Sequence, residues 1–84
     1  MIGFDELGKK ILAFLEEELG IEGEDLAPDA PLVTTGLIDS AGLVRLAALV
    51  ETATGLLIPD RDTTADNFDS LVKIDAYLRS RLAE

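Results

Sequence analysis

The stretch GLIDSAGLVRL, residues 36–46, decides how this chain is organised, because two helix-start signals coincide in it. Asp39 and Ser40 are both residue types that cap a helix N-terminus, since a short side-chain oxygen accepts a hydrogen bond from an unpaired backbone N–H. Apolar residues then recur at helical spacing, which places a serine hydroxyl at the start of a predicted helix. Backbone amides and the helix dipole favour an anion there. On these residues alone, Ser40 as a simple helix cap is the commoner interpretation.

Helical periodicity predicts a first helix over residues 3 to about 19, with Gly20 as its C-terminal cap. Its expected core face consists of Phe4, Leu7, Ile11, Leu12 and Leu15. Residues 21–39 then form a long connection, which Gly23, Pro28, Pro31 and Gly36 keep from regular structure. We expect it to be an ordered loop, because apolar residues are spaced along it as anchors: Ile21, Leu26, Leu32 and Val33.

A second helix is predicted over residues 40–54, ended by Gly55, and a last helix over residues 69–82, capped by Asp69 or Ser70. The expected core residues are Leu43, Leu46, Ala47, Val50 and Ala53 in the former, and Leu71, Ile74, Leu78 and Leu82 in the latter. Between them, Pro59 fixes an extended turn, with Ile58 expected to be half buried, and one short helical turn is predicted near residues 63–67. Three amphipathic helices and a short one indicate a small all-α bundle. Tyr77 is expected to pack at its edge.

Composition narrows the function. The chain has 84 residues, enough for one domain with a small core, and its 17 acidic against 7 basic residues give a net charge of −10. Such a surface repels nucleic acid and anionic membranes and attracts basic patches on proteins, although solubility alone is an equally good explanation. The absence of Cys and His removes thiol and imidazole nucleophiles, disulfides and the usual zinc ligands. No long apolar run predicts a transmembrane segment or a signal peptide, so we expect a cytoplasmic protein.

No metal site is predicted. Asp60, Asp62 and Asp66 are spaced like the ligands of a calcium loop. However, Ala65 stands where that loop requires glycine, and Leu71 stands where it requires a bidentate glutamate.

Three segments together carry a family resemblance. Residues 36–41 (GLIDSA), 56–62 (LLIPDRD) and 67–74 (NFDSLVKI) resemble, in order, the Asp-Ser-Leu helix start, the Ile-Pro-Asp-x-Asp turn and the start of the last helix of acyl carrier and peptidyl carrier proteins. The resemblance covers essentially the whole chain. It implies one phosphopantetheine-binding domain over residues 1–84, folded as a four-helix bundle of the acyl-carrier-protein type with a long first loop.

The resemblance implies that Ser40 carries a 4′-phosphopantetheine group, attached covalently from coenzyme A, with Leu37, Ile38 and Asp39 as supporting motif residues. The protein would then be a non-catalytic, monomeric carrier of acyl or aminoacyl thioesters in fatty-acid, polyketide or nonribosomal-peptide-type biosynthesis. The implied partners are a phosphopantetheinyl transferase, an adenylating ligase or acyltransferase, and condensing or other acyl-processing enzymes. The candidate partner contacts are Leu37, Ala41, Val44, Arg45, Ala48, Ile58 and Arg61.

Two departures from the family pattern concern partner choice. Ala41 stands where the family usually has leucine, and the second helix lacks the several acidic residues of the fatty-acid carriers that the chain resembles. The smooth second helix favours an aminoacyl or peptidyl carrier recognised through small apolar contacts, unless the alanines only promote the helix, and the length of the chain suits a free-standing carrier. The alternative is an unmodified helical interaction or structural module. An enzyme is the least supported, since no acid–base pair is evident and a small bundle has little room for a pocket.

Overall fold

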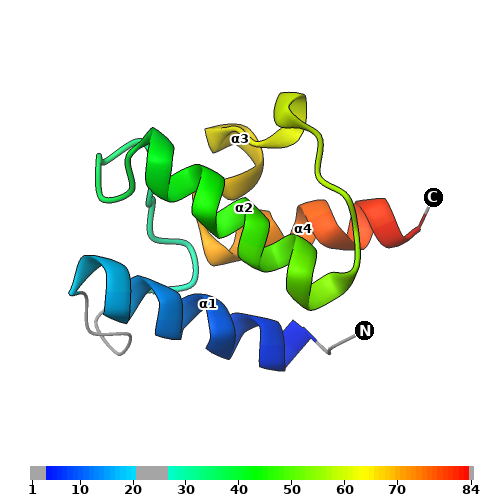
Figure 1. Ribbon diagram of the computed structural model, residues 1–84, viewed down its shortest axis with the longest axis horizontal. Coiled ribbons are helices and arrows are strands. Elements are labelled where there is room, and N and C mark those ends of the chain that lie inside the picture. The colour runs from blue at the N-terminus through cyan, green and yellow to red at the C-terminus, as the bar shows by residue number, and fades with distance from the viewer. Residues whose placement is uncertain (1–3, 21–26, 84) are drawn as a thin grey trace.

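The computed structural model describes residues 4–20 and 27–83, and every regular element in these two ranges is helical. The small all-α bundle expected from the sequence, with three main helices and one short one, is confirmed (Figure 1). The elements in chain order are α1 (Phe4–Leu19), α2 (Ser40–Thr54), the 3₁₀ helix η2 (Asp60–Asp62), α3 (Ala65–Phe68) and α4 (Leu71–Leu82).

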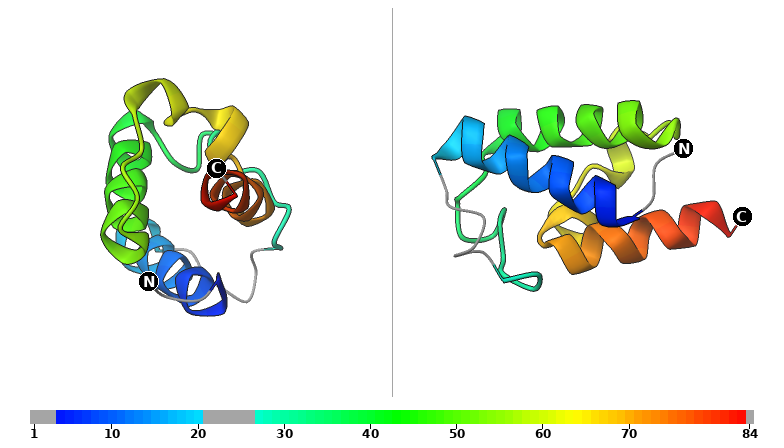
Figure 2. Two further views of the ribbon diagram at one scale, coloured as in Figure 1. Left: turned by 90° about the vertical axis from the view of Figure 1, so that its right-hand side faces the viewer. Right: turned by 90° about the horizontal axis from the view of Figure 1, so that it is seen from below.

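The three long helices lie side by side along the length of the bundle, but they do not all run in the same direction. Helix α1 runs against α2 and α4, so α2 and α4 begin at the end of the bundle where α1 finishes (Figures 1 and 2). The loop of residues 27–39 lies at this same end. The start of α1 and the end of α4 lie at the opposite end.

The core is apolar and draws on every long helix, as the periodicity predicted. Burying one such side chain contributes about 1.5–3 kcal/mol relative to leaving it exposed. The buried residues are Leu7, Ile11, Leu15, Leu32, Ile38, Leu46, Ala47, Val50, Ile58, Phe68, Ile74 and Leu78.

Some expected core positions differ. Leu12 and Leu82 are not in the core: Leu12 faces a groove between α1 and α4, and Leu82, in the last turn of α4, is 38% exposed. Ile58, expected half buried, is 8% exposed and therefore belongs to the core. Phe14, which the predicted face omitted, packs against it. The position of the Phe4 side chain lies outside what the structure describes.

The glycine caps are where the sequence placed them. Gly55 has φ +75° and its N–H donates to the Glu51 carbonyl at 2.8 Å, which ends α2 at the predicted residue. Gly20 has φ +68° and donates to the Glu16 carbonyl at 3.0 Å, which ends α1. A left-handed residue closes a helix in this way because it turns the chain back toward the unpaired carbonyls.

Helix α4 begins two residues later than predicted. The Ser70 hydroxyl accepts a hydrogen bond from the Lys73 N–H at 3.1 Å, so Ser70, not Asp69, is the cap. Helix α3 (Ala65–Phe68) likewise begins two residues later, and ends one residue later, than the helical turn predicted near residues 63–67.

Asp69 holds the loop before α2. Its Oδ1 accepts hydrogen bonds from three consecutive backbone N–H groups, those of Leu32 at 3.1 Å, Val33 at 2.7 Å and Thr34 at 2.9 Å. Its Oδ2 accepts from the Thr34 hydroxyl at 2.9 Å, and its backbone carbonyl accepts from the Leu32 N–H. Leu32 is fully buried and Val33 packs against the core, which confirms both as loop anchors. The expected roles of Ile21, Gly23 and Leu26 lie outside the described residues.

Tyr77 connects η2 to α4 at the edge of the bundle, the packing position expected for it. Its ring lies 5.7 Å from that of Phe68. Its hydroxyl donates to Asp62 at 2.7 Å and accepts from Arg81 at 2.8 Å. Burial and the hydrogen bond to the Asp62 carboxylate raise the pKa of Tyr77, against the opposing effect of Arg81.

Asp69 makes part of the stability depend on pH. The hydrogen bond from the Thr34 N–H is the largest influence and lowers the pKa of Asp69; burial opposes it, and the bonds from Val33, the Thr34 hydroxyl and Leu32 lower it further. Because the pKa is lower in the folded state, the stability from Asp69 is fully present above the unfolded pKa of about 4. It is lost as the pH falls through the lowered, folded value.

We therefore expect Asp69→Asn to lower Tm at neutral pH, and the difference in Tm between the variant and the parent to narrow below about pH 4. Thermal unfolding, followed by circular dichroism at a series of pH values from acid to neutral, measures this difference in Tm. Asp66→Asn, which removes an exposed carboxylate from α3, is the control for the loss of one surface charge. A Tm difference that stays constant across the series would show that Asp69 does not contribute in this way.

Candidate functional site

Ser40 is the first residue of α2, and Asp39 is the helix cap. Asp39 has an extended backbone, its Oδ1 accepts from the Gly42 N–H at 2.7 Å, and its carbonyl accepts from the Leu43 N–H at 2.9 Å. The interpretation of Ser40 as the cap is therefore wrong. Ser40 is exposed, and its hydroxyl makes no hydrogen bond to any residue in ranges 4–20 and 27–83.

Gly42 lets the helix start approach the loop. A Cβ atom at this position would lie 2.9 Å from Cγ2 of Ile38 and 3.3 Å from Oδ1 of Asp39. Ile38 is 1% exposed, so its side chain has little room to move away. The predicted motif residue Ile38 thus anchors the loop in the core beside Ser40. The close packing at Gly42 was not predicted from the sequence. The only available signal was the presence of a glycine in the first turn of a helix.

The three serines of the chain differ in what their hydroxyls can do. Ser70 is 4% exposed and its hydroxyl is occupied by the Lys73 N–H. Ser80 is exposed, but it lies near the C-terminal end of α4, where the helix dipole disfavours an anion. Ser40 alone combines exposure with a helix N-terminus.

The electrostatics at the start of α2 suit a phosphate ester. The first turn contains no acidic residue. The N–H groups of the first residues of a helix have no intrahelical partner. The Asp39 carboxylate accepts the Gly42 N–H, and those of Ser40 and Ala41 remain without such a partner. These two donors and the positive end of the helix dipole lie beside the Ser40 oxygen.

A stripe of small and apolar side chains runs along α2 from this point. Ala41, Val44 and Ala48 are exposed at i, i+3 and i+7, and the loop residue Leu37 is also exposed. Val44 is 63% and Leu37 41% exposed, which are high values for apolar residues. We call Leu37, Ala41, Val44 and Ala48 the α2 stripe.

Both charged residues of α2 are engaged within the protein. Nη1 of Arg45 lies 2.9 Å from Oε2 of Glu18 at the end of α1. The Glu51 carboxylate accepts from the Ile58 N–H at 2.7 Å and so holds the Ile-Pro turn. Of the two charged residues of α2, Arg45 is thus paired with an opposite charge and Glu51 is held by a backbone N–H, on a chain of net charge −10.

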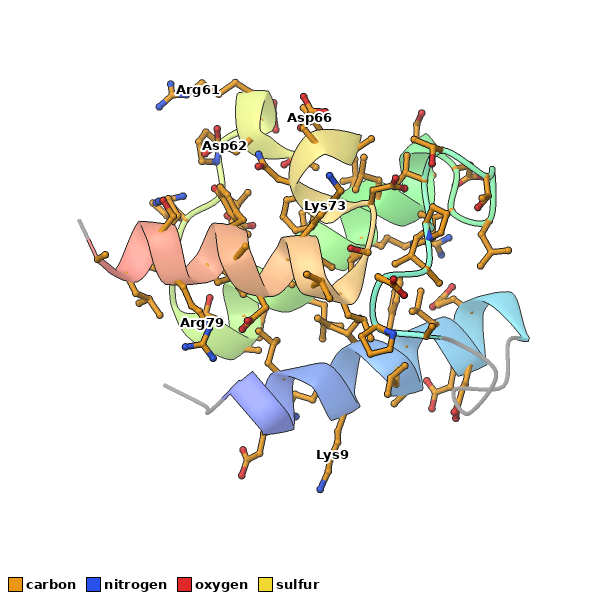
Figure 3. The ribbon with its side chains drawn as sticks, turned by 180° about the vertical axis from the view of Figure 1, so that it is seen from behind. Lys9, Arg61, Asp62, Asp66, Lys73 and Arg79 are labelled. Carbon is orange, nitrogen blue, oxygen red and sulfur yellow. The ribbon has the colours of Figure 1, made fainter. Side chains whose placement is uncertain are left out.

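The other two candidate contact residues do not join the stripe. Ile58 is a core residue, so little of its side chain is available to a partner. Arg61 lies on η2, its side chain is 85% exposed, and it points away from the bundle (Figure 3).

Two hollows among the described residues lie away from Ser40. A cavity of about 40 Å³ lies between α1 and α4, beside an open groove of about 430 Å³ on the face seen in Figure 3. Within residues 4–20 and 27–83, no group of three acidic side chains is placed to hold a metal ion. None of the helices there is both long and apolar enough to cross a membrane.

We expect Gly42→Ala to destabilise the fold, because overpacking costs about 1–3 kcal/mol and helix propensity returns at most about 1 kcal/mol. Gly8→Ala in α1 is the matched control, since a Cβ there would meet no atom within 4 Å and should raise stability. Chemical denaturation of the two variants gives the free energies of unfolding. Equal stabilisation of both would mean that the contact with Ile38 does not constrain the helix start.

The model of the family described as the phosphopantetheine attachment site matches residues 9–74, which run from α1 into α4 and include Ser40. Domains of this family are non-catalytic carriers with a covalently attached 4′-phosphopantetheine, and they interact with modifying and processing enzymes. The match confirms the resemblance read from residues 36–41, 56–62 and 67–74. The chain therefore belongs to the phosphopantetheine attachment site family of carrier proteins.

Proposed function

We propose that Ser40 is the residue to which 4′-phosphopantetheine is attached, and that residues 1–84 form a single, monomeric, cytoplasmic carrier domain. The observation that carries this proposal is the exposed Ser40 hydroxyl at the start of α2, left without a structural role because Asp39 caps the helix. The group would supply the thiol that this cysteine-free chain lacks.

The residues at the helix start fit the attachment. In the transfer, the Ser40 oxygen attacks the phosphorus that bears the pantetheine arm of coenzyme A. The P–O bond of the pyrophosphate breaks, adenosine 3′,5′-bisphosphate leaves, and a base of the separate transferase takes the hydroxyl proton. Asp39 keeps the helix start in place, and the free N–H groups of Ser40 and Ala41 are available to a phosphate oxygen. A carrier of this kind acts as a tether, because attachment raises the effective concentration of an acyl or aminoacyl group at each enzyme site.

The α2 stripe supports the aminoacyl or peptidyl carrier over the fatty-acyl carrier. With Arg45 paired to Glu18 and Glu51 turned to the Ile-Pro turn, a partner enzyme meets, beyond the exposed Asp39, the small apolar side chains of the α2 stripe. Such a surface suits an apolar docking site better than a strongly basic one. The acidic residues elsewhere still steer the encounter, since long-range charge raises association rates without tight binding. An adenylating ligase is therefore the proposed loading enzyme.

The modification of Ser40 is tested by intact mass after incubation with coenzyme A and a broad-specificity phosphopantetheinyl transferase. We expect one phosphopantetheinyl addition on the parent protein and on Ser80→Ala, and none on Ser40→Ala. Because Ser40 is not the cap, Ser40→Ala should change stability by less than about 0.5 kcal/mol. The variant thus separates attachment from folding.

Absence of the addition on folded parent protein would favour the alternative, an unmodified helical interaction module. Addition that persists in Ser40→Ala would place the attachment on another residue.

The role of the α2 stripe is tested by Val44→Glu. We expect a higher KM for loading by an adenylating ligase, since a charge then faces an apolar docking site, with a stability change within about 0.5 kcal/mol because Val44 is exposed. Ala76→Glu adds the same charge to the exposed side of α4 and serves as the control. The readout is the loading rate of the modified carrier across a panel of ligases and acyltransferases. Loading by acyltransferases alone would contradict the aminoacyl preference.

A further inference from the structure

We propose that Asp69 is a positioning residue for Ser40: it holds the loop of residues 32–39 so that the serine is presented to the enzymes that modify and load it. This inference rests on the proposed attachment at Ser40. Asp69 itself lies at the junction of α3 and α4, 29 positions along the chain from Ser40, and makes no hydrogen bond to it.

The first link joins Asp69 to the loop. One carboxylate accepts three consecutive backbone N–H groups and the Thr34 hydroxyl, at 2.7–3.1 Å. These bonds fix the course of the chain at Leu32, Val33 and Thr34 from a point 35 to 37 residues away. Asp69 is only 9% exposed, so water competes little for its oxygens.

The second link joins the fixed loop to the residue before the cap. The Ile38 N–H donates to the Leu32 carbonyl at 2.9 Å, so the residue that Asp69 holds also holds Ile38. Leu32 is fully buried and Ile38 is 1% exposed, which makes the pair a rigid base for the loop. The turn between them is closed by a hydrogen bond from the Gly36 N–H to the Val33 carbonyl at 3.0 Å.

The third link joins the loop to the helix start. The Ile38 side chain packs against Gly42, and the Gly42 N–H is the donor to the Asp39 cap. Ser40 lies between Ile38 and Gly42 in the chain, so the positions of these two residues determine the position of Ser40. The starts of α2 and α4 lie at one end of the bundle, which keeps this chain of contacts short (Figure 2).

This arrangement predicts a particular kinetic signature. If the loop is released, Ser40 is in its binding position only part of the time, and the apparent affinity for an enzyme falls by that fraction. KM for the carrier should therefore rise, while kcat, measured with the carrier bound, should change little. A purely stabilising role for Asp69 would move neither constant at temperatures where the protein is folded.

The experiment compares the steady-state kinetics of Ser40 modification by a phosphopantetheinyl transferase in four variants, well below every Tm. We expect Asp69→Ala to raise KM about tenfold or more with kcat nearly unchanged. Asp69→Asn, which keeps an acceptor oxygen, and Thr34→Ala, which loses only the bond to Oδ2, should give smaller increases. Leu78→Ala, which weakens the core of α4 elsewhere, should leave KM unchanged.

Backbone amide exchange gives a second readout that needs no modification. Exchange at Ile38, Gly42 and Leu43 should quicken in Asp69→Ala and not in Leu78→Ala. An unchanged KM in Asp69→Ala, or an equal rise in Leu78→Ala, would overturn the proposal. If the parent protein is not modified at all, the function proposed for Ser40 fails instead. Exchange at the three amides then decides on its own whether Asp69 positions the helix start.

Discussion

The arrangement of the end of the bundle that carries Ser40 depends on one carboxylate that accepts hydrogen bonds from three backbone amides. A loop has no internal ladder of hydrogen bonds, so a loop that enters the core must satisfy its N–H groups elsewhere. Asp69 does this for Leu32, Val33 and Thr34, and so allows Leu32 to be fully buried. Once Leu32 is in place, Ile38 can pack beneath the first turn of α2. The first turn of α2, which begins with Ser40, then packs on buried residues and not on a loose loop.

The local features of the fold could be predicted from the sequence. Asp39 and Gly55 set the ends of α2 through contacts within four residues, and the i, i+4 spacing of Leu7, Ile11 and Leu15 sets the face of α1. The start of α2 at Ser40 was predicted for the same reason, whereas the role proposed for Ser40 came from the family resemblance of residues 36–41 and not from these short-range signals. Capping and periodicity are short-range effects, and one sequence is enough to read them.

The contacts that could not be predicted are long-range. By residue type, Asp69 and Ser70 are equally good helix caps. The loop 35 to 37 residues away decides between them, because its N–H groups bind the Asp69 carboxylate and Ser70 is left to cap α4. The pairing of Arg45 with Glu18 is a similar case, because periodicity does not say how two helices are rotated against each other. The close approach of Gly42 to Ile38 depends on a side chain whose direction is set by the core.

The direction of the helices has a practical consequence. Phe4 begins α1 and Leu82 ends α4 on the side of the bundle away from Ser40, in a molecule whose longest extent is 34 Å (Figure 1). A linker, a neighbouring domain or a solid support joined at either place would hold the carrier by the far side. Ser40, which is exposed at the other end, would then stay accessible, and the group proposed to be attached there could reach several enzymes while the rest of the molecule stays anchored.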